Sequence, residues 1–161
     1  MKPKVYYSRD EMFKLNCERL AERGVQIQDI AEIAYKQQSR YNSNVDMRTC
    51  IEYVEKILSY RDIFHLVQLG IEIDRLTEEG VFRSPIQEIM RADLGMFGID
   101  EIFGLTIAGN FGVIGQTNFG DIDVNKPGIV NKLNAEGKGV RCHTFLDDIV
   151  GAIAAAASTR V

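Results

Sequence analysis

The sequence predicts an all-α fold, in which residues 1–161 form one multihelical domain with a buried central helix surrounded by about five or more others. Three observations indicate this class. Apolar residues of the first half recur with helical spacing between capping residues. The apolar segments of the second half are rich in glycine and alanine and contain few of the β-branched residues that favour strands. No repeat or linker divides the chain, whose length is usual for one domain.

Four helices are expected in the first half, and cap or stop residues bound them. Ser8 with Glu11 three residues later is a capping box, and Gly24 is a typical C-terminal stop. Asp46 is an N-cap candidate, and Gly80 ends a later apolar stripe. The expected helices cover residues 9–23, a second from after Gln26 or Gln28 to the polar run 39–44, a third from Asp46 through Leu58, and a fourth through Phe64 to Leu76.

A short fifth helix is expected after Ser84. Pro85 suits the first helical position, where the missing N–H of proline costs nothing. We expect this helix to run to about Ala92, followed by a glycine-containing turn over residues 93–98.

The segment from Ile99 to about Gly115 is apolar nearly all round, and its glycines lie three to five residues apart. Each glycine weakens a helix by about 1 kcal/mol relative to alanine. On one face, however, glycine allows a second helix to approach closely. We interpret this segment as the buried central helix, with a pair of strands as the alternative.

The last third predicts two more helices around a loop. Pro127 favours a short helix over residues 126–135, and Gly137 to Gly139 form a flexible loop. Thr144 and Asp147 resemble a capping box in which Asp replaces the usual Glu or Gln. The final helix would run from Phe145 to about Arg160, with its alanine-rich face packed against the glycine-rich segment.

Composition limits the classes of function and the compartment. A net charge of −4 argues against nucleic-acid binding, which favours basic surfaces. Cys17, Cys50 and Cys142 are far apart and match no zinc spacing, so reduced thiols are expected, the first two on helix faces. The N-terminus shows no apolar signal-peptide core, and no apolar run approaches the roughly 20 residues of a membrane span. We expect a cytoplasmic protein that can contact the inner face of the membrane.

Three acidic clusters lie in the second half, each next to apolar sequence: Asp100-Glu101, Asp121 with Asp123, and Asp147-Asp148. A carboxylate in an apolar segment must be paired, hydrogen-bonded or metal-bound, because a lone buried charge is costly. Oxygen ligands of this kind suit Mg²⁺ or Mn²⁺. Caps and ion pairs are the simpler alternative.

Helix geometry limits which of these acids can share one centre. Adjacent helical residues point about 100° apart, so at most one of each pair is expected to face a common ligand. We favour Asp148 as the ligand and Asp147 as the cap, while Asp100 and Glu101 are equally suited.

Basic residues accompany the acidic clusters. Lys126 follows Asp123 by three residues and either neutralises a phosphate or pairs with that carboxylate. Lys138, Arg141 and His143 flank the glycine loop and could donate hydrogen bonds to an anion. His143 is a candidate general acid or base, although a lone histidine is more often structural. The chain has no dinucleotide fingerprint, phosphate loop, nucleophile elbow or HExxH motif.

Three of these segments together resemble the phosphatidylglycerophosphatase A family, most closely its soluble relatives of the low-temperature-requirement C branch. Ile99-Asp-Glu-Ile-Phe-Gly104 is similar to the family's V-W-D-E-F-I-G. Asp123-x-x-Lys126-Pro127 is similar to its D-x-W-K-P, and Leu146-Asp-Asp-Ile-Val-Gly-Ala152 to its I-D-D-I-V-A-G. The order of the motifs agrees, and the resemblance covers about residues 95–158.

The resemblance implies an Mg²⁺-dependent hydrolase of phospholipid biosynthesis that removes the phosphate monoester from phosphatidylglycerophosphate. The implied partner is a phosphorylated lipid or a small phosphate monoester, and a homo-oligomer is compatible with it. Carried over by position, the implied catalytic residues are Asp123, Lys126 and Asp148. The implied metal ligands are Asp100, Glu101, Asp123, Asp147 and Asp148.

Two departures from the family pattern motivate alternatives. The N-terminal G-x-G-x-x-P stretch and the membrane-spanning segments of membrane-bound members are not reproduced here. A non-catalytic relative that binds a phosphorylated ligand or a protein partner is therefore the second hypothesis. In a third, purely structural one, the acids are caps and ion pairs of a helical oligomer.

Overall fold

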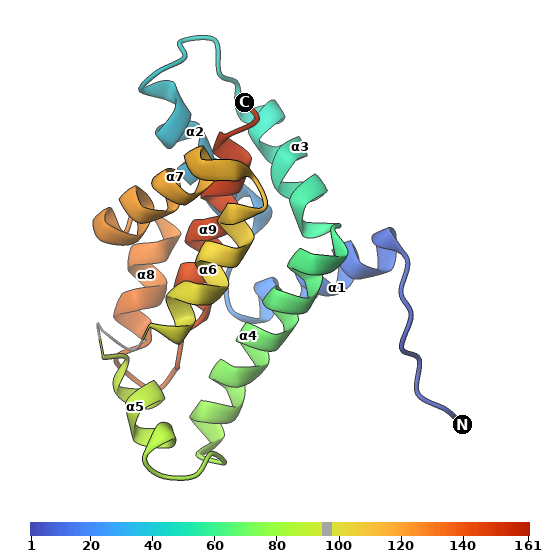
Figure 1. The fold of residues 1–161 in the computed structure, drawn as a ribbon, viewed down its shortest axis with the longest axis vertical. Coiled ribbons are helices and arrows are strands. Elements are labelled where there is room, and N and C mark those ends of the chain that lie inside the picture. The colour runs from blue at the N-terminus through green and yellow to red at the C-terminus, as the bar shows by residue number, and fades with distance from the viewer. Residues whose placement is uncertain (95–97) are drawn as a thin grey trace.

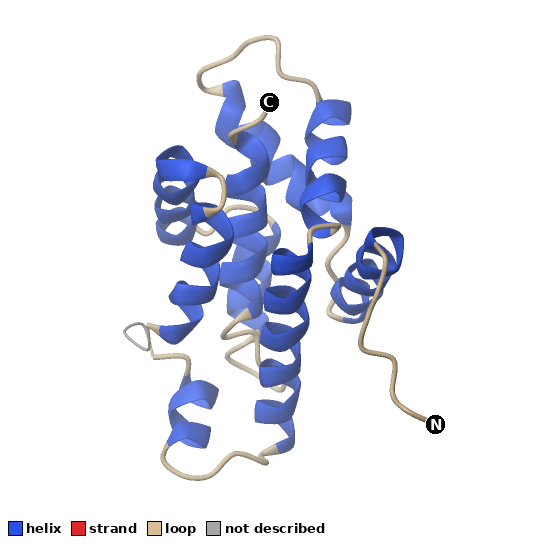
Figure 2. Cartoon of the chain, turned by 45° about the vertical axis from the view of Figure 1, so that its right-hand side comes forward, coloured by secondary structure: helices blue, strands red, loops and turns tan. Residues whose placement is uncertain are grey.

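The structure is a computed structural model that describes residues 1–94 and 98–161. Within these residues the chain is helical with connecting loops and contains no strand (Figure 2). The helices are α1 (Arg9–Glu22), α2 (Ile27–Ser39), α3 (Met47–Leu58), α4 (Arg61–Glu79), α5 (Ile86–Ala92), α6 (Ile99–Gly109), α7 (Gly112–Asn125), α8 (Ile129–Glu136) and α9 (Leu146–Ser158). The expected all-α fold is confirmed, and the first four helices begin and end within a few residues of their predicted limits.

The central helix is α9, which runs through the middle of the other helices (Figure 1). Every residue of α9 is buried. The helices α2, α3, α4, α6, α7 and α8 all pack against it, because its glycine and alanine positions let neighbours approach from all sides. None of the helices formed by the described residues combines the length and the apolar composition that a bilayer-spanning segment requires.

The prediction of one buried helix over residues 99–115 is wrong. The segment breaks after Gly109 into α6 and α7, and the φ of +86° at Gly112 marks the reversal. Nor is it buried all round, because Ile99, Ile102 and Leu105 are exposed on the outer face of α6. Its all-round apolar character therefore reflects an exposed apolar surface as well as a core face.

Glycines nevertheless provide the expected close helix approach, between α6 and α7. A Cβ atom on Gly104 would lie 2.3 Å from a ring atom of Phe119, and one on Gly115 would lie 2.4 Å from the carbonyl oxygen of Ala108. Only glycine fits at these two positions, because any Cβ atom would clash. The α6–α7 hairpin then packs as a unit against α9 (Figure 1).

Three local predictions shift. The helix α5 begins at Ile86 with Pro85 as its N-cap, and α8 begins at Ile129, two residues after Pro127. Lys126 does not begin α8; it is the C-cap of α7 and has a φ of +45°. The extension of α7 to Asn125 was not predicted, because apolar and polar residues do not separate onto two faces of this helix. The expected turn over residues 93–98 lies partly outside the described residues.

Candidate functional site

A pocket of about 340 Å³ forms where the C-terminal ends of α5 and α7 meet the N-terminal ends of α6 and α9. Six carboxylates and two lysines line it, which gives an excess of four negative charges when every carboxyl group is ionised. Its lining is Asp93, Leu94, Asp100, Glu101, Asp123, Lys126, Asn134, Lys138, Asp147 and Asp148. A phosphate dianion would be repelled from such a pocket unless cations were added, because like charges at short range repel strongly in a partly buried site.

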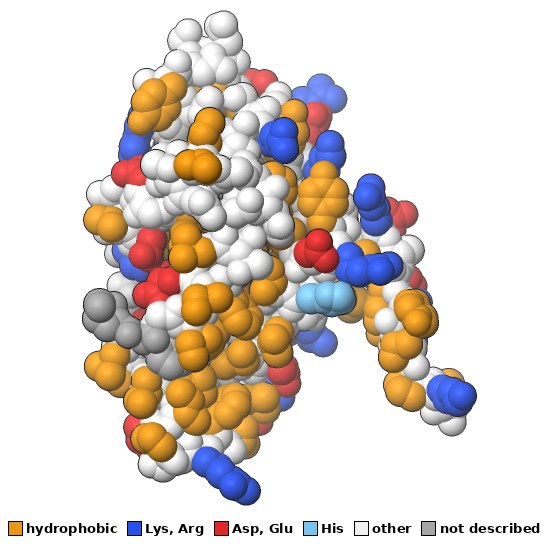
Figure 3. Space-filling view, in the orientation of Figure 1, with side chains coloured by type: hydrophobic (Ala, Val, Ile, Leu, Met, Phe, Trp, Pro, Cys, Tyr) orange, Lys and Arg blue, Asp and Glu red, His pale blue; other side chains and the backbone are white. Residues whose placement is uncertain are grey.

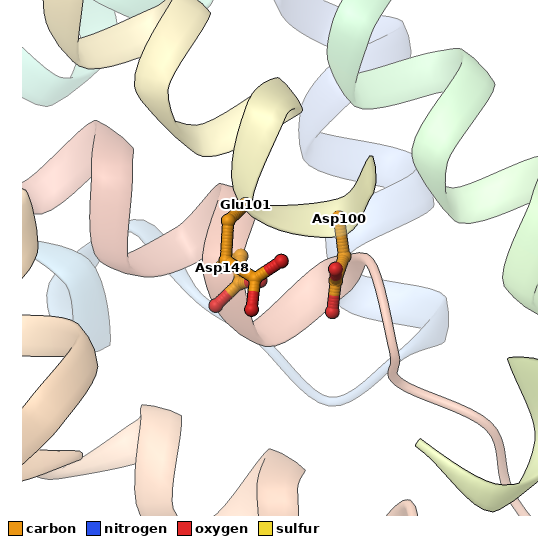
Figure 4. A group of neighbouring side chains, drawn as sticks. All are labelled: Asp100, Glu101 and Asp148. Carbon is orange, nitrogen blue, oxygen red and sulfur yellow. The ribbon is translucent and has the colours of Figure 1, made fainter. Parts of the chain in front are cut away.

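Three of the carboxylates come from the first turns of two helices and meet at one point. Asp100 and Glu101 lie on α6, and Asp148 lies on α9 (Figure 4). One carboxylate oxygen from each lies within 4.8 Å of the others. The expectation that only one of Asp100 and Glu101 would face this point is wrong, because the longer glutamate side chain reaches it from the neighbouring position.

Two oxygens of this cluster have no hydrogen-bond partner among the described residues. They are Oδ1 of Asp100 and Oε2 of Glu101, and both atoms are buried. Leaving a buried polar atom unpaired typically costs about 1–3 kcal/mol, so such atoms call for an explanation. A hard divalent cation fits this donor set, because Mg²⁺ and Mn²⁺ prefer carboxylate oxygens.

The carboxyl groups of this cluster resist ionisation. Desolvation, followed by the neighbouring Glu101, raises the pKa of Asp100 to about 8. Desolvation, followed by the charge of Asp147, raises the pKa of Asp148 to about 10. In the absence of a cation, protons therefore neutralise part of the cluster near neutral pH.

Lys126 forms ion pairs with Asp123 and Asp147, the other two carboxylates that were predicted as metal ligands. Its Nζ donates to Oδ1 of Asp123 at 2.7 Å and to Oδ2 of Asp147 at 3.2 Å, and lies 3.8 Å from Oδ1 of Asp148. Desolvation lowers the pKa of Lys126, but these carboxylates outweigh it and raise the pKa above its usual range. Burial raises the pKa of Asp147 to about 6 even with this lysine beside it.

The predicted cap of the final helix is wrong. Asp147 faces Lys126, and its Oδ1 accepts a hydrogen bond from the N–H of Asp148 at 2.9 Å. The backbone N–H groups of Phe145 and Leu146 instead donate to the carboxylate of Asp74 on α4, at 3.0 and 2.9 Å. Sequence reasoning missed Asp74, although the signal was present: it continues the buried stripe of Val67 and Ile71 on α4.

The remaining predicted residues are divided between the pocket and the rest of the fold. Lys138 lines the pocket, but Arg141 donates to the carbonyl of Glu22 instead. His143 is buried outside the lining, and burial lowers its pKa, which suits a neutral structural residue. Asp121 pairs with Arg40 at 2.9 Å and is also outside the lining. Asp93 lines the pocket and was not predicted.

Hydrophobic side chains border the acidic pocket. Leu94 belongs to its lining, and Ile99 and Ile102 are exposed on the adjoining α6. Figure 3 shows acidic side chains that reach the surface beside a broad hydrophobic area. A ligand with a charged end and an apolar end would find both kinds of surface here.

Comparisons with known proteins agree with the motifs. The family model of phosphatidylglycerophosphatase A matches residues 43–161. The chain is 44% identical to YpjQ of Bacillus subtilis (strain 168) over 96% of this chain and 86% of that protein, and 42% identical to YutG of the same organism over 89% and 86%. The crystal structure of YpjQ superposes with a TM-score of 0.89 over 96% of this chain and 94% of that one. The low temperature requirement C protein of Listeria monocytogenes, 46% identical, gives 0.88 over 92% and 93%.

Proposed function

The chain belongs to the phosphatidylglycerophosphatase A family, and from this premise we propose that it is a divalent-metal-dependent phosphatase that removes the phosphate monoester of phosphatidylglycerophosphate. The matched region, residues 43–161, contains every residue of the acidic pocket. The observation that carries the proposal is the convergence of Asp100, Glu101 and Asp148 with two buried, unpaired oxygens.

In this proposal Asp100, Glu101 and Asp148 hold an Mg²⁺ ion. All three offer hard oxygen ligands within 4.8 Å of one another. Among the described residues, the only ion pair that any of the three forms is that of Asp148 with Lys126, at 3.8 Å. When bound, Mg²⁺ supplies charge neutralisation for the phosphate and Lewis acidity toward water. Because carboxylates outnumber lysines in the pocket, the cation is needed to reduce the negative charge before a phosphate can enter.

The side chains around the cluster have separate roles. Lys126 and Lys138 supply positive charge to the phosphate oxygens, and Lys126 also fixes the orientation of Asp123. Asp123 is more exposed than Asp148, with a side chain 29% accessible, so it can accept a proton from an attacking water. Asp147 holds Lys126 from the other side.

The hydrophobic border supports a lipid substrate. Leu94, Ile99 and Ile102 offer an apolar surface beside the mouth of the pocket, where the glycerolipid part of the substrate would lie while its phosphate enters. With this arrangement a protein reaches the headgroup from the membrane surface without inserting a helix.

The test is phosphate release from phosphatidylglycerophosphate in detergent micelles, with Mg²⁺ or with EDTA. Wild-type protein is expected to release phosphate only with Mg²⁺. Asp148→Asn and Asp123→Asn should lower the rate at least a hundredfold. Asp121→Asn is the matched control, because it removes a carboxylate of α7 that lies outside the pocket.

Melting temperatures separate catalysis from binding. At a hundredfold excess over Kd, Mg²⁺ should stabilise the wild type by about 2.7 kcal/mol, or roughly 5–10 °C for a chain of this size, and Asp148→Asn by far less. Mg²⁺-dependent stabilisation without any phosphate release would contradict the phosphatase and favour the non-catalytic relative. Absence of both effects would favour the purely structural alternative.

A further inference from the structure

A second polar site lies at the other end of the central helices. Two adjoining cavities of about 240 and 430 Å³ share Tyr60, Phe111 and Arg160 in their linings. Arg160 follows α9, and Phe111 follows α6, whereas the acidic pocket lies at the N-terminal ends of both helices. At 1.5 Å per residue, about 15 Å of helix separates Asp148 from Ser158, the last residue of α9, and Arg160 follows two residues later.

The charge of these cavities is opposite to that of the acidic pocket and to that of the whole chain. Arg9, Lys56, Arg61 and Arg160 line them against the single carboxylate of Asp62. None of the four basic side chains forms an ion pair with any described residue. The same holds for Arg83, Arg91 and Arg141, which lie outside these cavities, but not for the paired arginines Arg19, Arg23, Arg40, Arg48 and Arg75. A chain of net charge −4 therefore gathers unneutralised positive charge at one place.

Aromatic rings, rather than carboxylates, hold two of these arginines. The guanidinium carbon of Arg9 lies 5.6 Å from the ring centre of Tyr60, and that of Arg160 lies 5.9 Å from the ring centre of Phe111. The two rings stack at 6.4 Å with 27° between their planes. A cation–π contact orients a guanidinium over its flat face and leaves the N–H donors at its edge free.

Helix electrostatics do not explain this arrangement. Arg9 and Arg61 are the first residues of α1 and α4, where the helix dipole disfavours a positive side chain. The carboxylates of the same first turns, Asp10 and Glu11 on α1 and Asp62 on α4, already complement the dipole, so the two arginines are not placed there to stabilise the helices. Arg61, Asp62 and Ile63 of the first turn of α4 line the larger cavity, and the N-cap Tyr60 makes no side-chain cap bond to this turn.

We infer that these two cavities form an oxyanion site, in which Arg9, Arg61, Arg160 and Lys56 bind a phosphate-bearing ligand. Planar guanidinium groups with free edges suit the bidentate recognition of phosphate oxygens. The phosphate could belong to a soluble anion or to a lipid headgroup. The site is independent of the proposed phosphatase activity, because it shares no lining residue with the acidic pocket.

Binding of a soluble phosphate-bearing anion is tested by calorimetric titration of the full chain with inorganic pyrophosphate. The buffer contains EDTA, which keeps metal out of the acidic pocket. Wild-type protein should bind saturably, and the double variant Arg9→Gln/Arg160→Gln should bind at least tenfold more weakly. Arg48→Gln/Arg75→Gln is the matched control: it also removes two charges, from exposed arginines that are paired with Glu52 and Glu72 and lie outside both cavities. Asp148→Asn should bind pyrophosphate like the wild type.

Binding of a lipid headgroup at the same site is tested by co-sedimentation of the protein with phosphatidylglycerol or phosphatidylcholine vesicles. Co-sedimentation with phosphatidylglycerol alone, lost in the double variant, would identify a headgroup as the ligand, and pyrophosphate binding without it would identify a soluble anion. Either result supports the site once circular dichroism shows that the variant is folded. The site is refuted if the wild type binds neither probe, or if the double variant binds as well as the wild type does.

Discussion

The carboxylate of Asp74, in the second half of α4, accepts the backbone N–H of Leu146, the first residue of α9, at 2.9 Å. It also accepts the N–H of Phe145 and lies 3.8 Å from the thiol sulfur of Cys142. Burial raises the pKa of Asp74, and these N–H donors oppose the shift. One buried side chain thus fixes where the central helix begins, and with it the position of Asp148.

Replacing Asp74 should therefore affect both stability and the acidic pocket. Asp74→Ala removes the carboxylate that accepts the buried N–H groups of Phe145 and Leu146, and we expect a loss of about 1–3 kcal/mol in the free energy of unfolding. Asp74→Asn keeps one acceptor oxygen and should lose less. Urea denaturation measures both. Equal stability of the alanine variant and the wild type would show that Asp74 does not anchor α9.

The sequence was sufficient to predict features governed by local signals. The capping box of Ser8 and Glu11 is present at the start of α1, Asp46 caps α3 through the N–H of Thr49, and Gly80 ends α4 in a left-handed conformation. Each depends on residues within about four positions of one another, which is the range over which capping chemistry acts.

Features that depend on tertiary contacts could not be predicted in this way. The cap of α9 comes from a residue more than 70 positions earlier in the chain, so Thr144 and Asp147 formed a plausible but incorrect local box. Thr144 instead donates to the carbonyl of Met90 at 2.7 Å. The acidic residues themselves could be identified from the sequence, because a carboxylate in an apolar segment needs a partner. Their division into a three-carboxylate cluster and two partners of Lys126 required the structure.

Two glycines of α7 should respond oppositely to alanine. Gly115→Ala would place a Cβ atom 2.4 Å from the carbonyl oxygen of Ala108, and backbone there cannot move without separating α6 from α7. We expect a loss of about 1–3 kcal/mol in the free energy of unfolding. Gly120→Ala meets no atom within 4 Å and should gain up to about 1 kcal/mol, because alanine favours the helix. Thermal or urea unfolding gives both values, and a stabilised Gly115→Ala variant would contradict the close approach.

The stability of the metal-free protein should fall as pH rises from 7 to 8.5. In this window the unfolded chain has released its carboxyl protons, whereas the folded chain retains some, because the pKa of Asp100 is about 8 and that of Asp148 about 10. A folded state that binds more protons loses stability with rising pH, by up to about 1.4 kcal/mol per pH unit for each proton. Urea midpoints in EDTA measure this slope.

Variants and metal provide the controls for that slope. Asp148→Asn cannot ionise and should flatten the dependence, whereas Asp121→Asn should keep it. Mg²⁺ should stabilise the protein more at pH 8.5 than at pH 7, because protons and metal compete for the same carboxylates. His143, whose pKa burial lowers, contributes the opposite slope only below about pH 6.5, outside the window. Wild-type stability that increases from pH 7 to 8.5 in EDTA would refute the assignment.

Lys126 should be needed for the metal-free fold and for turnover, but not for metal binding. Lys126→Gln removes the only cation within 4 Å of Asp123, Asp147 and Asp148 among the described residues. We expect a loss of roughly 1–3 kcal/mol in the free energy of unfolding without metal, between the values for exposed and buried ion pairs.

Mg²⁺ should then raise the melting temperature of the Lys126→Gln variant by more than it raises that of the wild type, because the pocket has gained negative charge. Phosphate release should fall at least tenfold even at saturating Mg²⁺, since the substrate phosphate loses its lysine. Calorimetry with the Mg²⁺ titration and the micelle assay separates the two effects, and Lys132→Gln, which changes an exposed lysine of α8 outside the pocket, is the control. Weaker Mg²⁺ binding in Lys126→Gln than in the wild type would show that the lysine organises the carboxylates instead of competing with the metal.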